Sequence, residues 1–470
     1  MSGDYRALSF WLESLADEQG ENLTPRPGLK RDRRVDVCIV GGGLTGLWTA
    51  YYLAKADPSL SILVLEKEIA GFGASGRNGG WCSALFPRSA GALERAYGAD
   101  AAAAVRRAMV ATVDEVGRVV REEDIACDFA KGGTLSFARD AVQLEAARAE
   151  VAAAERLGVD RLQLIEDATA LARYGVGGGA VAAVLDPACA RVQPATLVRG
   201  LARVVESLGV QIYEGTQVTA WGAHRARFVS GRDGESVEGV VAAANVVIAV
   251  EGFGADLPGV GRHIMPLYSL MIATEPLPSE TWERIGIRQG QTFGDYRHLL
   301  VYGQRTADDR IAFGGRGARY HWGSRIRPEY DTSERVLEHL RRALVDLFPA
   351  VEGAEVTHHW GGPLGVPRDW HPSASYNPRT GVAFAGGYVG DGLSTTNLAG
   401  RTLRDLLLGI RSELTALPWV NHRSPKWEPE PLRFLGANLG LAGMGIADVE
   451  ERMLARPSLA ARLIAPLTGH

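Results

Sequence analysis

The residues whose types and spacing point most clearly to chemistry are those of one turn, Gly41-Gly42-Gly43-Leu44-Thr45-Gly46. Between a strand and a helix, the first glycine of such a turn permits the tight bend, and the second lets the backbone approach a pyrophosphate. The third glycine lets the helix pack closely on the strand. Gly41, Gly43 and Gly46 occupy these positions. The spacing therefore predicts a phosphate-binding turn at the start of a helix.

A carboxylate stands where such a turn requires one. Glu66 follows Gly46 by 20 residues and ends a second apolar stretch, where an acidic side chain accepts hydrogen bonds from ribose hydroxyls. The alternative is a glycine turn without a ligand, but it leaves the combined spacing of strand, helix and acid unexplained. We therefore predict a dinucleotide site. These residues alone leave both NAD(P) and FAD open.

A second glycine-rich segment begins five residues after Glu66 and runs Gly71-Phe72-Gly73-Ala74-Ser75-Gly76-Arg77-Asn78-Gly79-Gly80. It offers closely spaced backbone N–H groups and one cation. Such a loop can wrap a phosphate and then run beside a ring.

These motifs resemble the D-amino acid oxidase and glycine oxidase family of flavoenzymes, in which a similar GxGASGRNxG loop follows the ribose acid. Within that family the chain is most similar to the gamma-glutamylputrescine oxidoreductase-like branch. The resemblance covers about residues 8–410 and includes the late turn Ala385 to Gly392. It implies FAD as the cofactor, bound non-covalently or nearly so, and a late turn and helix that face the flavin ring.

The resemblance also implies which residues hold FAD. They are Gly41, Gly43, Leu44, Thr45, Gly46, Glu66, Lys67, Gly73, Ala74, Ser75, Arg77, Asn78, Gly79, Gly80, Val218, Gly252, Gly387, Tyr388, Gly390, Gly392, Leu393 and Ser394. A helix that begins near Leu393 would direct its positive end at the flavin pyrimidine edge, where reduction places negative charge.

The resemblance places several aromatic and basic residues around the ring, and we take Arg319, His358, Trp360 and Tyr388 as catalytic candidates. For each aromatic, core packing is the alternative. Arg319 takes the place of a lysine that helps oxygen accept electrons in related sarcosine oxidases, and residues 132–425 contain no lysine. His358 lies near the position where some relatives attach flavin through a cysteine; a hydrogen-bonded histidine is the alternative.

The pattern of apolar residues predicts the elements that position these groups. Strands are expected at Val35–Val40, Ser61–Leu65, Gln211–Tyr213, Asn245–Val250, Met265–Thr274 and Val382–Ala385. Helices are expected at Leu93–Glu123, Ala141–Leu157, Pro194–Leu208, 333–347 and Leu393–Leu408. After Gly409 we expect a tail with short helices.

We therefore predict an α/β fold, in which a discontinuous Rossmann-type FAD-binding domain carries an inserted substrate domain built on an antiparallel sheet. The expected ranges are 1–34 for an N-terminal arm, 35–95, 190–255 and 355–415 for the FAD-binding domain, 96–189 and 256–354 for the substrate domain, and 416–470 for the tail.

Composition narrows the class of protein. The 470 residues are 46% hydrophobic and 23% charged, which is typical of a globular chain, and the net charge of −4 predicts no nucleic-acid partner. The four cysteines form no CxxC pair, so we expect reduced thiols, no metal and a cytoplasmic location. No signal pattern or membrane-spanning stretch is apparent. The amphipathic tail favours internal packing or a homodimer contact.

The predicted activity is oxidation of the C–N bond of an amine, by hydride transfer to flavin N5 to give an imine. Secondary amines, gamma-glutamyl amines and amino acids are the substrate classes that the resemblance implies, with oxygen or another acceptor reoxidising the enzyme. Two alternatives remain: a flavin monooxygenase that uses NAD(P)H, and a non-catalytic flavin-binding interaction protein. The loop from Gly71 to Gly80 argues against the monooxygenase.

Overall fold

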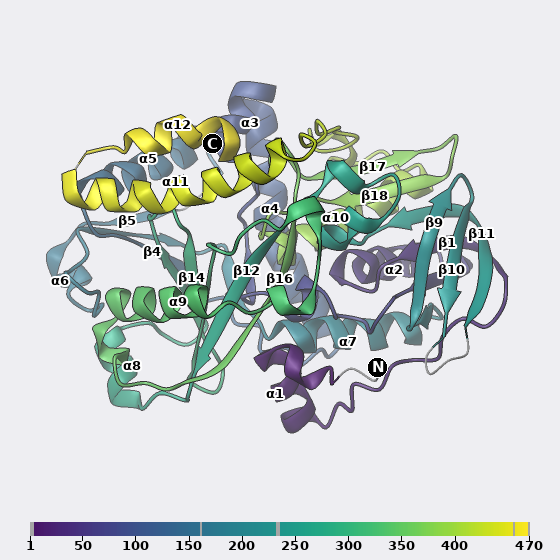
Figure 1. The fold of residues 1–470 in the computed structure, drawn as a ribbon, viewed down its shortest axis with the longest axis horizontal. Coiled ribbons are helices and arrows are strands. Elements are labelled where there is room, and N and C mark those ends of the chain that lie inside the picture. Colours follow the sequence, from purple (N-terminus) through teal and green to yellow (C-terminus); the bar gives the residue numbers. More distant parts are fainter. Residues whose placement is uncertain (1–3, 160–161, 232–235, 455, 469–470) are drawn as a thin grey trace.

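The computed structural model describes residues 4–159, 162–231, 236–454 and 456–468. Within them, two eight-stranded sheets carry most of the structure, beside a two-stranded ribbon of β3 (Trp81–Ser83) and β7 (Cys189–Arg191). Figure 1 shows the first sheet on the right and the second sheet on the left. The fold is mixed α/β, as the sequence predicts.

The first sheet holds the glycine turn. Its strand order is β17 (Ser373–Asn377), β18 (Val382–Gly386), β11 (Val237–Ile248), β1 (Arg33–Val40), β2 (Ile62–Leu65) and β8 (Gln211–Tyr213), and a hairpin of β9 (Thr216–Gly222) and β10 (Arg225–Ser230) extends β11. β1 pairs in parallel with both β2 and β11. The last four residues of β1 are buried because both faces of a parallel sheet are covered.

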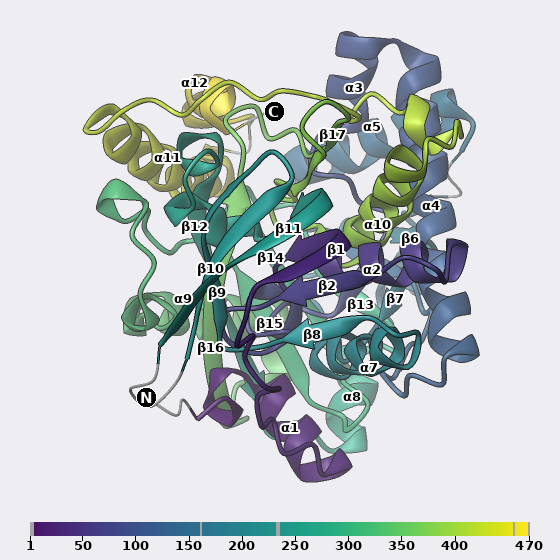
Figure 2. The same ribbon diagram turned by 90° about the vertical axis from the view of Figure 1, so that its right-hand side faces the viewer.

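Helices cover one face of this sheet and the β9–β10 hairpin lies toward the other (Figure 2). The covering helices are α2 (Leu44–Ala56), α7 (Pro194–Ser207) and α10 (Gly392–Leu408). The expected helix over Leu93–Glu123 is instead two helices, α3 (Ala90–Tyr97) and α4 (Ala99–Glu122). Gly98 separates them because its φ of +89° lies outside the helical region.

The second sheet runs β16 (Val356–Val366), β12 (Met265–Thr274), β15 (Ile311–Gly315), β14 (Val301–Arg305), β13 (Thr292–Asp295), β4 (Thr134–Ala138), β6 (Ala182–Asp186) and β5 (Gln163–Ile165). The sheet is antiparallel, as the sequence predicts, at every pair except β13 with β4, which run parallel. These two strands are far apart in the chain, so the pattern of short strands and turns, which indicates hairpins between neighbouring strands, does not predict that they pair. β16 lies here, although its residues fall in the range 355–415 expected for the FAD-binding domain.

Helices flank the second sheet: α9 (Glu334–Leu347), α5 (Ala141–Leu157), α6 (Ala168–Leu171) and α8 (Ser279–Ile285). The apolar side of α9, with Leu340 and Leu344, packs against the same core as Leu270 and Phe313 of the sheet. α5 begins and ends where the sequence predicts, because Asp140 caps its first turn and Gly158 takes the left-handed conformation after it.

The two ends of the chain also form helices. α1 (Phe10–Gln19) buries Phe10, Trp11, Leu12 and Leu15. The tail forms a helix of 23 residues, α11 (Leu432–Leu454), and then α12 (Leu459–Thr468), so the expectation of short helices alone is wrong. None of the helices in the described ranges combines the length and apolar character needed to cross a bilayer.

Candidate functional site

A cavity of about 560 Å³ lies at the carboxyl ends of the parallel strands of the first sheet. The residues that directly follow β1, β2 and β11 line it: Gly41, Glu66 and Ala249. Ligands of open α/β sheets bind at this edge, where successive connections leave a crevice between strands. The position of the cavity therefore follows from strand order.

The glycine turn forms one wall of this cavity. A Cβ on Gly41 would stand 2.3 Å from the Ala249 carbonyl oxygen, and one on Gly46 would stand 2.1 Å from the Gly41 carbonyl oxygen, so both positions require glycine. A Cβ on Gly43 would meet only Ser75, at 3.0 Å from Oγ. Gly43, Leu44 and Thr45 line the cavity at the start of α2, whereas Gly46 packs behind them.

Glu66 lies beside the turn. Its Oε2 accepts a hydrogen bond from Gly42 N at 2.7 Å, and its Oε1 accepts one from Glu68 N at 2.8 Å. Burial raises the pKa of Glu66 to about 7, although these two N–H groups act in the opposite direction. Lys67, the next residue, also lines the cavity. A carboxylate held in this way can accept hydrogen bonds from a ribose.

The first part of the loop after Glu66 lines the cavity, and its last residues pack in the protein interior. Gly73, Ala74, Ser75, Arg77 and Asn78 line the cavity, and Ser75 Oγ accepts a hydrogen bond from Leu44 N at 2.9 Å. The guanidinium of Arg77 is buried and donates to Asp331 at 2.7 Å and to the Gly361 carbonyl at 3.0 Å, so this cation links the loop to the second sheet.

The end of the same loop does not reach the cavity. Gly79 and Gly80 lie under the second sheet, where a Cβ would stand 2.4 Å from the Tyr302 ring and 2.1 Å from the amide nitrogen of Gln304. Gln304 donates to the Gly79 carbonyl at 2.7 Å. These two glycines permit close packing between loop and sheet.

The turn between β18 and α10 forms the opposite wall. Tyr388, Gly390, Gly392 and Leu393 line the cavity, and the Tyr388 hydroxyl lies 3.1 Å from Thr45 Oγ1. Gly387 and Ser394 face away from it: a Cβ on Gly387 would meet Pro367, and Ser394 donates to the Ser83 carbonyl. The first turn of α10 thus presents its N–H groups at the cavity.

A titratable pair lies behind this turn. Asp391 precedes α10 and its pKa is raised to about 6 by burial, while the nearby Arg316 guanidinium acts to lower it. Arg316 donates to the Val389 carbonyl at 3.0 Å and lies over the Trp370 ring.

The structure brings one of the four catalytic candidates to the cavity, Tyr388. Arg319 is exposed and lies outside the cavity lining. The ring of His358 packs on Phe10 of α1, and its Nε2 lies 3.4 Å from Glu13. Trp360 is buried beneath the loop and donates to the Arg77 carbonyl at 2.8 Å. The geometry therefore supports packing roles for His358 and Trp360, and shows no contact of Arg319 with the site.

Glu251 is the titratable residue beside the late turn that the sequence prediction missed. Glu251 lines the cavity, and its two carboxyl oxygens accept hydrogen bonds from Gly387 N at 2.9 Å and Tyr388 N at 3.1 Å. Burial raises its pKa to about 7. A signal was available, because Glu251 follows an apolar strand as Glu66 does.

The remaining predicted residues lie at two other places on the wall. Val218 lines the cavity with its β9 neighbours Gln217 and Thr219, and Gly252 lines it beside Glu251. Pro363 and Leu364 of β16 close the cavity from the second sheet. The wall is rich in glycine, is faced by two helix N-termini and carries a ribose-type carboxylate. These features fit a dinucleotide.

Comparison with known proteins identifies the dinucleotide as FAD. A family model described as "FAD dependent oxidoreductase", abbreviated DAO, matches residues 36–406. Gamma-glutamylputrescine oxidoreductase of Escherichia coli (strain K12) is 32% identical over 393 residues, which span 82% of this chain and 87% of that protein. Sarcosine oxidase subunit beta of an Arthrobacter species is 25% identical over 427 residues, spanning 88% of this chain and 96% of that protein.

Solved structures show the same fold. Glycine oxidase from Geobacillus kaustophilus superposes with a TM-score of 0.66 at 21% identity, over 83% of this chain and 99% of that one. L-proline dehydrogenase from P. horikoshii superposes with a TM-score of 0.65 at 18% identity, over 82% of this chain and 96% of that one. Because the family model covers most of the chain and the cavity carries the matching glycine turn, this chain belongs to the DAO family of FAD-dependent oxidoreductases.

Proposed function

We propose that this enzyme oxidises the C–N bond of an amine. The observation that carries the proposal is the placement of the cavity, which has the dinucleotide wall of the first sheet on one side and Pro363 and Leu364 of the second sheet on the other. A substrate that enters between the two sheets would meet the cofactor away from bulk water. The amine class is supported by the relatives named for gamma-glutamylputrescine and sarcosine.

The residues on the cavity wall would hold the cofactor by backbone and carboxylate groups. Gly41 permits the tight turn, Gly43 would let the chain approach the pyrophosphate, and the N-terminus of α2 would offer N–H groups to it. Glu66 would accept hydrogen bonds from the ribose, and Val218 would contact the adenine end. Tyr388, the one catalytic candidate on the wall, would contact the ring or the substrate.

When bound, FAD supplies the two-electron acceptor for the substrate C–H bond. The chain supplies electrostatics and exclusion of water. The N–H groups of the first turn of α10 stabilise negative charge at the cavity wall, and Glu251 holds the preceding turn in place through two hydrogen bonds. The ion pair of buried Arg77 with the partly exposed Asp331 closes the side of the cavity toward the second sheet.

The experiment that tests this proposal is anaerobic mixing of the yellow holoenzyme with a panel of compounds. Secondary amines, gamma-glutamyl amines and amino acids are expected to bleach the visible flavin band without NAD(P)H, whereas simple alcohols are not. Bleaching by alcohols alone would contradict the amine assignment. Bleaching that requires NAD(P)H would favour a monooxygenase, and tight FAD with no bleaching across the panel would favour a flavin-binding interaction protein.

We also propose that residues 35–95, 190–255 and 355–415 form the FAD-binding domain and that residues 96–189 and 256–354 form the substrate domain. The division is supported by sheet membership, since the strands from 35–95 and 190–255 that enter an eight-stranded sheet lie in the first one. β16 is the exception, because its residues fall in the range 355–415 but it pairs within the second sheet.

We propose a cytoplasmic location, because Cys38, Cys82, Cys127 and Cys189 are free and buried. We also propose that the enzyme is a homodimer joined through α11. Six apolar side chains of α11, each about half exposed or more, repeat at heptad spacing, and we name this set the α11 stripe: Leu432, Leu435, Leu439, Ile446, Val449 and Met453. Such a stripe is typical of a helix that packs on a second copy of itself.

A further inference from the structure

The family match begins at residue 36, and most of the N-terminal arm expected at 1–34 is described in the structure. We keep the name N-terminal arm for residues 4–29. The arm lies against the outer side of the segment 66–78, whose inner side lines the cavity. It makes two separate sets of contacts with that segment, one near each end.

The first set joins α1 to the far end of the segment. Ser9 Oγ donates a hydrogen bond to the Gly76 carbonyl at 2.9 Å, and Trp11 Nε1 donates one to the Asn78 carbonyl at 2.8 Å. Trp360 Nε1 donates a hydrogen bond to the carbonyl between them, that of Arg77, at 2.8 Å. Three consecutive carbonyls are therefore satisfied from outside, which fixes the side of the loop that faces the cavity.

The second set centres on Glu214, whose side chain is fully buried. Its carboxylate accepts hydrogen bonds from Arg26 N at 2.6 Å, from Arg26 Nη1 at 2.8 Å and from Ala70 N at 2.7 Å. Arg199 of α7 adds a contact at 3.3 Å. Glu214 thus ties the arm to Ala70, at the near end of the same segment.

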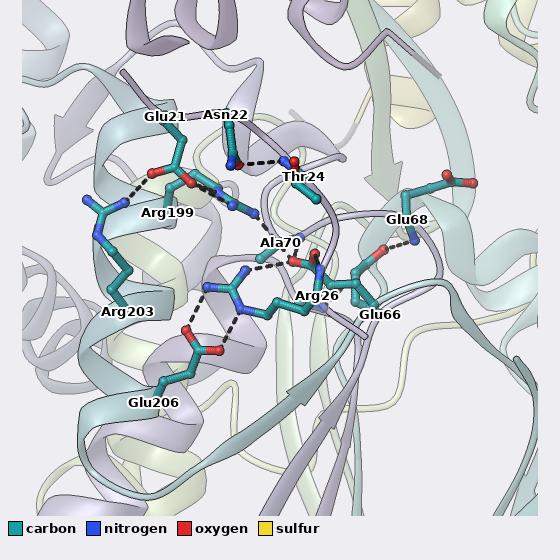
Figure 3. Close-up of polar contacts among 12 residues, drawn as sticks. Glu21, Asn22, Thr24, Arg26, Glu66, Glu68, Ala70, Arg199, Arg203 and Glu206 are labelled. Atoms are coloured by element: carbon teal, nitrogen blue, oxygen red, sulfur yellow. Dashed lines mark hydrogen bonds and ion pairs between the residues drawn. The ribbon is translucent and has the colours of Figure 1, made fainter. Parts of the chain in front are cut away.

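Further ion pairs balance the charges of this junction (Figure 3). Arg26 also donates to both carboxyl oxygens of Glu206, at 2.6 and 2.7 Å. Glu21 accepts from Arg199 at 2.7 Å and from Arg203 at 2.5 Å. Three guanidinium groups therefore face three carboxylates. A buried carboxylate is tolerated in such an arrangement, and loss of one guanidinium leaves its charge poorly compensated, which destabilises the junction.

Backbone hydrogen bonds connect this junction to Glu66, the carboxylate proposed to bind the ribose. Gly215 N donates to the Glu68 carbonyl at 3.2 Å, and Thr216 N donates to the Glu66 carbonyl at 2.8 Å. Tyr5 of the arm adds a hydrogen bond from its hydroxyl to Glu68 at 3.1 Å. The charge of Glu214 also acts to raise the pKa of Glu66.

We propose that the N-terminal arm is a clamp that retains FAD, in which Arg26 and Trp11 are positioning residues that fix the segment 66–78 from behind. The inference rests on the proposed placement of FAD in the cavity. Neither residue lines the cavity, so each acts through the loop.

The first test is a charge rescue. Arg26→Met removes the guanidinium that the arm places against the buried charge of Glu214, while the backbone N of residue 26 and Arg199 still donate to it. We expect the Kd of the folded apoprotein for FAD to rise about ten- to a hundredfold, measured by quenching of FAD fluorescence. Arg26→Met with Glu214→Gln removes the buried charge and keeps one oxygen as the acceptor for Ala70 N, although the amide NH2 then faces the backbone N of residue 26. Because one unmatched hydrogen-bonding group costs less than a poorly compensated buried charge, we expect the Kd of this double variant to be at least about threefold below that of Arg26→Met. Arg6→Met is the control, because Arg6 pairs with Asp17 on the exposed side of the arm.

The second test compares two indole donors. Trp11→Phe removes the bond to the Asn78 carbonyl, and we expect FAD to dissociate about five- to tenfold faster, the effect of one hydrogen bond. Trp282→Phe removes a similar bond from a buried indole of α8 to the Asp309 carbonyl at 3.0 Å, and should leave FAD release unchanged while lowering thermal stability to a similar degree.

The outcomes separate the clamp from the cofactor placement. A wild-type Kd in Arg26→Met, no recovery in the double variant, or equal FAD release from the two tryptophan variants would each overturn the clamp. If Trp11→Phe fails to fold, the charge rescue decides alone. Retention of FAD by Gly43→Val, a change in the cavity wall itself, would contradict the cofactor placement instead.

Discussion

At the scale of single residues, the site is framed by two carboxyl groups with the same setting and different partners. Glu66 follows β2 and Glu251 follows β11, and burial raises the pKa of both to about 7. Glu66 accepts hydrogen bonds from backbone N–H groups of the glycine turn and of its own loop. Glu251 accepts hydrogen bonds from backbone N–H groups of the turn before α10. Each carboxyl group therefore fixes one wall of the cavity.

Replacement of Glu251 should change how the stability of the apoprotein depends on pH. The pKa is raised from 4.5 to about 7 in the folded state, so this group stabilises the fold fully below pH 4.5 and that contribution is lost as pH rises through about 7. In Glu251→Gln, we expect the fall in unfolding free energy between these pH values to be shallower by up to about 1.4 kcal/mol per pH unit.

The measurement is urea unfolding of the apoprotein at a series of pH values. Glu238→Gln serves as the control, because Glu238 is exposed on the same strand. An unchanged slope in Glu251→Gln would show that this carboxyl group does not titrate with a raised pKa.

Gly43→Val should abolish FAD binding. Gly43 opens on the cavity, and a Cβ at this position would have only Ser75 within 4 Å, so the branched side chain would fill the space that the pyrophosphate needs. Gly222→Val in β9 is the matched control, since nothing lies within 4 Å of its Cβ position. Flavin content after purification, read from the visible spectrum of each variant, decides the result.

At the scale of elements, the cavity depends on how closely α2 and α10 approach each other. The first residues of the two helices, Leu44 and Gly392, both line the cavity. The helices meet at Gly400, where a Cβ would stand 2.7 Å from the backbone of Trp48. A glycine at this contact sets the spacing of two helix N-termini that face the same cavity.

Gly400→Ala should therefore destabilise the protein by about 1–3 kcal/mol, the usual cost of overpacking, and weaken FAD binding in parallel. Gly436→Ala in α11 is the control; nothing lies within 4 Å of its Cβ position, and a helix interior gains about 0.5–1 kcal/mol from the same change. Denaturant unfolding of the apoproteins, followed by FAD titration, measures both effects. Equal stability in the two variants would rule out a close contact between the helices at Gly400.

At the scale of the whole molecule, the two sheets enclose the cavity and the tail leaves an apolar face uncovered within the single chain. The α11 stripe includes Leu439, with 65% of its surface exposed, and Ile446, with 58%. Exposed apolar side chains at heptad spacing do not stabilise a monomer, because they remain in water. Burial of the α11 stripe against a helix of a second chain would account for this pattern.

Leu439→Glu with Ile446→Glu should convert the enzyme from two chains to one, a mass of 50.4 kDa, with FAD retained. Size-exclusion chromatography with light scattering measures the mass, and Val181→Glu is the control because Val181 is 43% exposed on another part of the surface. A wild-type enzyme that already runs as a monomer would contradict the dimer proposal.

The sequence by itself determined the parts of this protein that depend on local spacing. The glycine turn, Glu66, the helix α5 and the strand β12 lie where short-range patterns predict, because turn geometry, capping and alternation act over a few residues. The family and the cofactor followed from the same local motifs.

Tertiary structure alone decided what depends on contacts between distant segments. It placed Gly79 and Gly80 under Tyr302 and Gln304, put His358 against α1, left Arg319 exposed, and brought Arg26 to Glu214 across 188 residues of chain. An alignment across a variable loop can be displaced by a few residues, so it does not place a single side chain. The two partners of a buried ion pair have no fixed separation in the sequence. These contacts are therefore fixed by packing of the two sheets and the arm, and no local pattern encodes them.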